Sequence, residues 1–188
     1  MGTLALVTAP IKEPVALDEL RRHLRIDTTD HDLALAKYLK AARVEAEGYT
    51  RRALITQTWD YKLDCWEYPI RLPIQPVQSV TSITYTGETG TTATLATSQY
   101  SVKGAAADGL CFIEPAYNVT WPTLREVSYP ITIRFVAGYG LSDSAVPEPI
   151  RIALMLRVEM LFDRDTRTQE LLNDAATSLL DLYRVLEV

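Results

Sequence analysis

The apolar positions of the first fifty residues recur with a helical period. Leu17, Leu20 and Leu24 are spaced three and four positions apart after Pro14, which predicts a short first helix. A polar DTTD stretch follows. From residue 32 to residue 49 the apolar positions again fall on one stripe, which predicts a second helix with one buried face. The stripe consists of Leu35, Leu39, Ala42, Ala46 and Tyr49.

The period changes to two at residue 58. In TWDYKLDC, Trp59, Tyr61, Leu63 and Cys65 alternate with polar residues, which predicts a half-buried antiparallel strand. Prolines surround IRLP, so that segment is expected at a sheet edge. Val80 is out of phase within its strand, which predicts a bulge. The other predicted β segments are VQSVTSITYT (77–86), a GETG hairpin turn (87–90), short strands around residues 95, 102 and 112, and ITIRFV (131–136).

Helical spacing returns after a glycine-containing loop. Pro147 and Pro149 open a third helix, whose residues 150–162 are apolar nearly all round. Such a helix must be covered on several sides, and in a chain this small one side is available to another subunit. A last helix, 168–186, carries a narrow seam suited to one partner helix, in its own domain or on a neighbouring protein. The seam residues are Leu172, Ala175, Leu179, Leu182 and Leu186.

These elements predict an α+β chain with an inserted domain. Residues 1–55 and 146–188 are expected to form a small helical bundle with two N-terminal and two C-terminal helices. Residues 56–145 are expected to form an antiparallel β subdomain inserted between those helices.

The charge balance argues against sequence-independent binding of nucleic acid. With 19 Lys and Arg against 24 Asp and Glu, the net charge is −5, whereas sequence-independent binding of phosphates needs a basic face. No apolar run approaches the roughly 20 residues that cross a bilayer. The first residues have neither a basic region nor a long apolar run, so a signal peptide is not expected. A cytoplasmic product without membrane contact is the expectation.

No catalytic, cofactor-binding or metal-binding residues are predicted. Cys65 and Cys111 lie far apart without a CxxC pair, only two histidines are available, and both thiols are expected to be buried. The chain has neither a glycine-rich phosphate loop nor a nucleophile elbow. The prediction is a protein that is not an enzyme.

Two alternative functions depend on particular side chains. Trp59, Trp66 and Trp121 could stack on sugars in a carbohydrate-binding β module, although inward-facing aromatics more often belong to a core. A basic cluster could contact DNA phosphates in a regulator or bind an acidic protein, although surface pairing with nearby acids is the preferred interpretation. This cluster consists of Arg21, Arg22, Arg25, Arg51 and Arg52.

An ordered series of segments resembles the tailed-bacteriophage head–tail connector (adaptor) family, which also occurs in phage-derived gene transfer agents. Each segment is short, and their order and spacing carry the resemblance over about residues 13–165. The segments are EPVALDELRRHLRID (13–27), AARVEAEGYTRRALITQTWD (41–60), IRLPIQPVQSVTSITYTGETG (70–90), YSV (100–102), WP (121–122), FVAGYG (135–140) and VPEPIRIALMLRVEMLFDRD (146–165).

The resemblance implies a structural subunit of the neck of a virion or particle, assembled in the bacterial host cytoplasm. Such subunits form a ring of about twelve copies below the portal protein through head-to-tail contacts. The ring extends the DNA channel and offers a docking surface to a stopper or other tail-side neck protein. DNA would pass without sequence-specific binding, and an acidic wall would let it slide.

The same resemblance suggests two sets of contact residues. The C-terminal segment commonly engages the portal in this family, and the residues chosen for that contact are Leu172, Leu179, Leu182, Tyr183 and Leu186. Those chosen for the contact between ring neighbours are Met155, Arg157, Met160, Phe162, Arg51 and Arg52.

Overall fold

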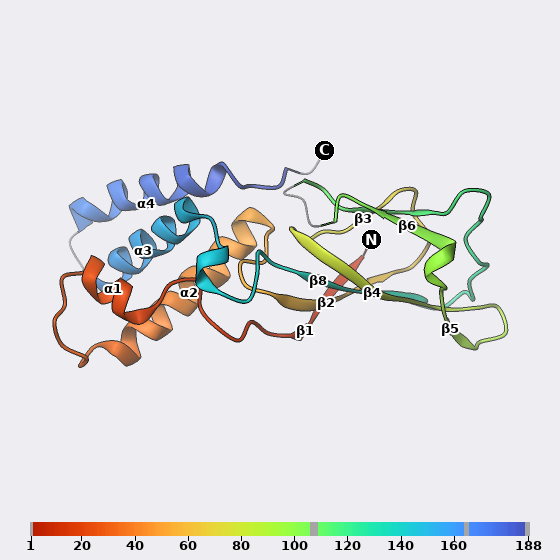
Figure 1. Cartoon of the computed structure of the whole chain (residues 1–188), viewed down its shortest axis with the longest axis horizontal. Coiled ribbons are helices and arrows are strands. Elements are labelled where there is room, and N and C mark those ends of the chain that lie inside the picture. Colours follow the sequence, from red (N-terminus) through yellow and green to blue (C-terminus); the bar gives the residue numbers. More distant parts are fainter. Residues whose placement is uncertain (1, 106–108, 164–165, 187–188) are drawn as a thin grey trace. The chain divides into compact units, whose positions relative to one another are not determined.

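The chain folds into two compact units. The computed structural model describes residues 2–105, 109–163 and 166–186, except for the side chains of 166–168. One unit, the β unit, comprises Met1–Ala9 and Thr56–Gly138, and the other, the helical unit, comprises Pro10–Ile55 and Tyr139–Val188 (Figure 1). Two helices precede the main β region and two follow it, so the predicted α+β class is confirmed.

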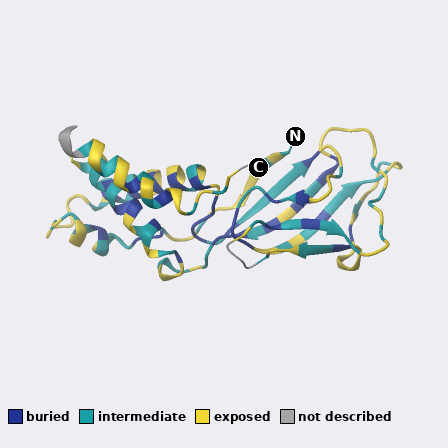
Figure 2. Cartoon of the chain, turned by 90° about the horizontal axis from the view of Figure 1, so that it is seen from above, coloured by how far each residue is buried: buried dark blue, intermediate teal, exposed yellow. Residues whose placement is uncertain are grey.

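The helical unit contains α1 (Leu17–His23), α2 (Asp32–Thr50), α3 (Glu148–Phe162) and α4 (Thr166–Asp181). The predicted stripe of α2 is buried, because Leu35, Leu39, Ala42 and Ala46 all belong to the core. Leu154 and Val158 of α3 and Leu180 of α4 belong to the same core. Figure 2 shows the buried residues of these helices on their inner sides. The core therefore joins helices from both ends of the chain.

The β unit contains two antiparallel sheets. The larger sheet has the order β1-β2-β8-β4-β5 and the smaller has the order β3-β7-β6. Figure 1 draws the smaller sheet above the larger one. The strands of the larger sheet are β1 (Thr3–Thr8), β2 (Gln57–Leu63), β8 (Ile131–Ala137), β4 (Val77–Thr86) and β5 (Thr92–Thr94). Those of the smaller sheet are β3 (Ile70–Arg71), β7 (Phe112–Pro115) and β6 (Tyr100–Lys103).

The two faces of the larger sheet differ in polarity, as the period-two pattern predicted. Ile83, Ile133 and Phe135 are fully buried on one face. On the other face, the Arg134 guanidinium donates two hydrogen bonds of 2.8 Å to the Asp60 carboxylate, and these bonds lower the pKa of Asp60. The predicted bulge is confirmed, since the register between β4 and β8 shifts on both sides of Val80.

Three features differ from the sequence-based expectation. Residues 3–8 were assigned to the helical bundle but form β1 and pair with β2, because a long-range strand pairing leaves no local helical or hairpin signal. Residues 139–145 lie with the helices, where the Tyr139 N–H donates to the Leu54 carbonyl. Cys65 is exposed, because β2 ends at Leu63 and the inward alternation ends with it.

A buried arginine ties α2 to the segments on either side of it. Arg43 is 5% exposed, and its guanidinium donates to Glu13 at 2.7 Å and to Glu47 at 2.8 Å. The second oxygen of Glu47 accepts the Leu54 N–H at 2.9 Å. Glu13 precedes α1 and Leu54 follows α2, so one ion-pair network holds both connections of the bundle.

Replacing Arg43 with Met is expected to destabilise the helical unit by roughly 3 kcal/mol, because two carboxylates lose their buried partner. The measurement is urea unfolding followed by the helical circular dichroism signal. Lys40→Met on the exposed side of the same helix is the matched control and should change stability by less than about 0.5 kcal/mol. Equal stability of the two variants would contradict a structural role for the network.

Candidate functional site

The last helix has one face in the core and one in solvent. Ala176 and Leu180 are buried, and Leu179 packs half-buried against the same core. On the outer side of α4, Leu171 is 72% exposed, and Leu182, the first residue after the helix, is 73% exposed. α4 and the residue that follows it therefore present isolated large apolar side chains to solvent, while the opposite face of the helix anchors it.

The chain after α4 is fixed to the end of α2. α2 ends at Thr50, and the next residue, Arg51, has a left-handed backbone (φ 57°). The Val185 N–H donates to the Thr50 carbonyl at 3.0 Å. The buried Arg52 donates from Nε to the Tyr183 carbonyl at 2.6 Å and from Nη1 to the Tyr139 hydroxyl at 3.2 Å. Main-chain and side-chain bonds thus hold the exit segment in a defined position.

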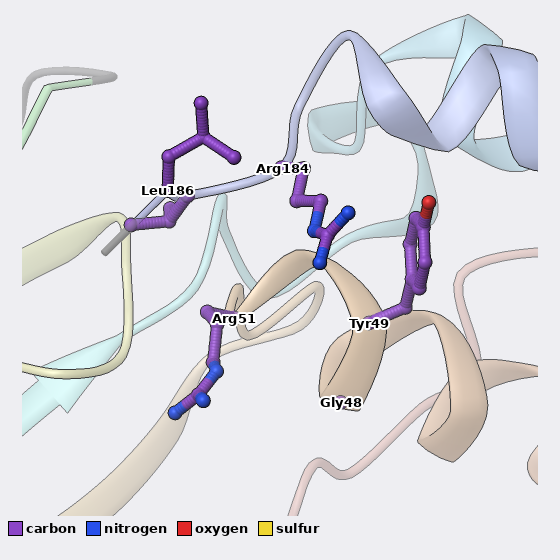
Figure 3. Close-up of a pocket in the computed structure, with 6 residues that line it drawn as sticks. Gly48, Tyr49, Arg51, Arg184 and Leu186 are labelled. Carbon is purple, nitrogen blue, oxygen red and sulfur yellow. The ribbon is translucent and has the colours of Figure 1, made fainter. Parts of the chain in front are cut away.

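A pocket of about 450 Å³ lies where the exit segment crosses α2 (Figure 3). The Tyr49 hydroxyl donates to Asp181 at 2.5 Å, and this bond raises the pKa of Tyr49. The Arg184 guanidinium lies 4.9 Å from the centre of the Tyr49 ring, and Figure 3 shows it beside that ring while Arg51 points away. The lining residues are Gly48, Tyr49, Arg51, Arg184, Val185 and Leu186.

The residues predicted to meet the portal fall into two groups. Leu172, Leu179 and Tyr183 are half-buried, and the last two pack against the helical core. Leu182 and Leu186 are exposed. The helix ends at Asp181, so the predicted seam does not continue as a helix to residue 186.

The residues predicted for ring contacts also divide. Met155, Arg157 and Arg52 are buried within the subunit. The Arg157 guanidinium donates to Asn173 and to Thr177 of α4, and it lies 3.4 Å from Glu45 of α2. Met160 and Phe162 are half-buried, and Arg51 is exposed. The buried members therefore serve the fold of one subunit.

Sequence reasoning missed the apolar groups that the structure leaves on the surface of α3 and α4. Ile152 and Leu161 are the exposed large apolar side chains of α3, and Leu171 is exposed on α4. The all-round apolar character of α3 concealed Ile152 and Leu161, because the pattern did not show which sides α2 and α4 would cover. Leu171 lies one position outside the predicted seam.

Several of the side chains behind the two alternative functions have partners within the chain. Trp66 stacks on Trp121 with ring centroids 4.6 Å apart, so neither presents both faces as a sugar platform. Arg22 pairs with Asp18 at 3.6 Å and Arg21 with Asp32 at 3.7 Å, as the preferred interpretation of the basic cluster expected.

Within the ranges that the structure describes, no group of three or more His, Cys, Asp or Glu residues could hold a metal ion. None of the described helices combines the length and apolar character that a membrane span requires.

Comparison with known proteins identifies the family. Residues 14–105, about half of the chain, match the model of the phage gp6-like head–tail connector protein family. The chain therefore belongs to the phage gp6-like head–tail connector family, whose members are structural proteins and not enzymes. This confirms the resemblance found in the sequence. No protein of curated function matches the chain.

Solved structures of gene transfer agent (GTA) particles contain chains similar to this one over nearly its full length. A chain of the neck of an empty GTA particle computed with C6 symmetry has a TM-score of 0.82 and 28% identity, covering 99% of this chain and 97% of that chain. A chain of the virion of a native GTA particle has a TM-score of 0.80 and 27% identity, covering 98% of this chain and 96% of that chain. A chain of the neck of a native GTA particle computed with C12 symmetry has a TM-score of 0.77 and 26% identity, covering 99% of this chain and 97% of that chain.

Leu180, near the end of α4, and Leu182, just after the helix, have opposite environments, and this difference gives a test of how the site is anchored. Leu180 is 1% exposed, so Leu180→Ala should destabilise the helical unit by roughly 3 kcal/mol through a core cavity. Leu182→Ala removes the same atoms from a solvent-exposed position and should cost less than about 0.5 kcal/mol. Urea unfolding by circular dichroism measures both, and a large loss for Leu182→Ala would mean that its side chain is not free for docking.

Proposed function

We propose that the protein is a head–tail connector subunit that forms a ring below the portal of a phage or phage-derived particle. The observation that carries this proposal is the similarity to chains of GTA necks, which spans both units and not only the residues of the family model. The C6 and C12 symmetries of those necks support a cyclic assembly of this chain as well. The copy number of about twelve follows the C12 case.

The helical unit offers side chains for the contact between ring neighbours. A ring of identical subunits closes through head-to-tail contacts between two different surfaces. Ile152 and Leu161 are exposed on α3, and Met160 and Phe162 remain partly accessible beside them in sequence. We assign these residues and Arg51 to the ring contact, whereas Met155, Arg157 and Arg52 position their own helices.

The exposed side of α4 and its exit is assigned to the portal protein. Leu171, Leu182 and Leu186 are exposed, and the pocket beside Leu186 adds a receptive surface. Leu179 and Tyr183 support this surface from beneath through their packing on the core, and the half-buried Leu172 is assigned to the same contact. A few large apolar anchors next to a pocket are the usual source of binding energy in a protein interface.

The net charge suits a channel wall. A chain with a net charge of −5 repels the DNA backbone on average, so DNA could slide through the ring without sequence-specific binding. The side of the ring that faces away from the portal would offer a docking surface to a stopper or other tail-side neck protein.

Deleting the gene from the producing phage or particle and imaging the products by electron microscopy tests the function. The expected products are heads that package DNA, leak it and lack tails. Complementation with the wild-type gene should restore tailed particles. Intact tailed particles in the deletion strain would reject the connector function.

The portal contact has a more specific test in the same strain. Complementation with Leu182→Asp/Leu186→Asp is expected to reduce tailed particles at least about tenfold, because charges replace apolar anchors at a loss of about 1.4 kcal/mol or more. Leu33→Asp is the control, since Leu33 is 83% exposed in the first turn of α2, whereas the pocket lies at the other end of that helix. Circular dichroism should show that both variants fold. Normal tailed particles from the double variant would reject this docking surface.

A further inference from the structure

The N-terminal strand leaves a long sheet edge open. β1 is an edge strand of the larger sheet, and in the described part of the chain only β2 pairs with it. Five of its six residues are exposed, including Leu6 at 47% and Val7 at 45%. An edge strand presents a row of main-chain N–H and C=O groups that can pair with another strand.

The composition of β1 makes this edge unusual within the molecule. Its sequence, TLALVT, has no charged residue and no proline, which are the residues that commonly block pairing at sheet edges. The other edges are shorter: β5 has three residues, β3 has two, and β6 has four and ends in Lys103, which pairs with Glu114. β1 is therefore the long, unprotected edge among the described strands.

We propose that the outer edge of β1 pairs with an edge strand of the neighbouring copy in the ring. This inference rests on the proposed connector function, because the ring supplies the neighbour. Main-chain hydrogen bonds would join the two copies, as when an extended segment adds to an existing sheet. The bulge between Leu6 and Thr8 restricts regular pairing to the first residues of the strand.

Stoichiometry and symmetry indicate that the strand paired with the β1 edge comes from a second copy of the chain. Each subunit carries one β1 edge, so the occupant must be present once per subunit, and the next copy meets this condition all around a ring. Pairing of β1 with β1 is excluded, because such a two-fold contact closes at a dimer. β5, the opposite edge of the same sheet, is uncharged (Thr92–Thr94) and provides a head-to-tail contact that can repeat.

Hydrogen exchange with residue-level resolution tests the pairing on the full chain, free and in assembled necks. In a regular antiparallel edge strand the outward N–H groups alternate with those bonded to the sheet. Alternate amides between Thr3 and Leu6 should exchange at least about tenfold more slowly in the ring than in the free subunit. Unchanged exchange in an assembled ring would overturn this inference and leave the connector function standing. Absence of the chain from any ring would overturn both.

A lysine pair introduced at the edge provides a second test. Ala5→Lys/Val7→Lys places charges at two exposed β1 positions, and Ala5 lies opposite Asp60 in the register, so the fold should tolerate the change. The control, Thr123→Lys/Ser128→Lys, adds equal charge at exposed loop positions of the β unit. The β1 variant should fold but enter necks at least about tenfold less than the control. Equal incorporation of the β1 variant and the control into necks would overturn the proposal. In the hydrogen-exchange experiment, protection of the β1 amides that appears only after another neck protein is added would overturn it as well.

Discussion

The architecture depends on a junction at the end of α2, where the chain leaves the helical unit and returns to it. Ile55 and Gly140 form a parallel bridge, and the Tyr139 N–H donates to the Leu54 carbonyl at 3.2 Å. The exit of α4 reaches the same place, because the Val185 N–H donates to the Thr50 carbonyl. The residue at which the chain leaves the helical unit and the residue at which it returns are therefore adjacent. The β region between them is a closed loop for the bundle, and the entropy cost of closing a loop rises only slowly with its length.

Local periodicity predicted most of the fold because most elements carry their own pattern. The buried stripe of α2, the antiparallel strand at β2 and the bulge at Val80 are properties of short segments, and the structure confirms each. β1 could not be found in this way. Its six residues become a strand only by pairing with β2, at least fifty positions away in sequence, and no turn signal connects the two.

The candidate site was predicted less completely, because a helical pattern does not show which of its sides the subunit itself will use. The predicted seam contains both the core-facing Leu179 of α4 and the solvent-facing Leu182, which follows the helix. Arginines are ambiguous for the same reason. Arg157 and Arg52 could have been interface residues on sequence alone, but each finds its hydrogen-bond acceptors inside its own subunit. Arg51, one position earlier than Arg52, is exposed because its left-handed backbone turns the chain there.

The tryptophans have a spectroscopic consequence. All three, Trp59, Trp66 and Trp121, belong to the β unit, and two of them are stacked. Intrinsic indole emission therefore comes from one half of the molecule only. The helical unit, with tyrosines such as Tyr49 and Tyr183, has no such chromophore, so the two halves can be followed by separate optical signals without attaching a dye.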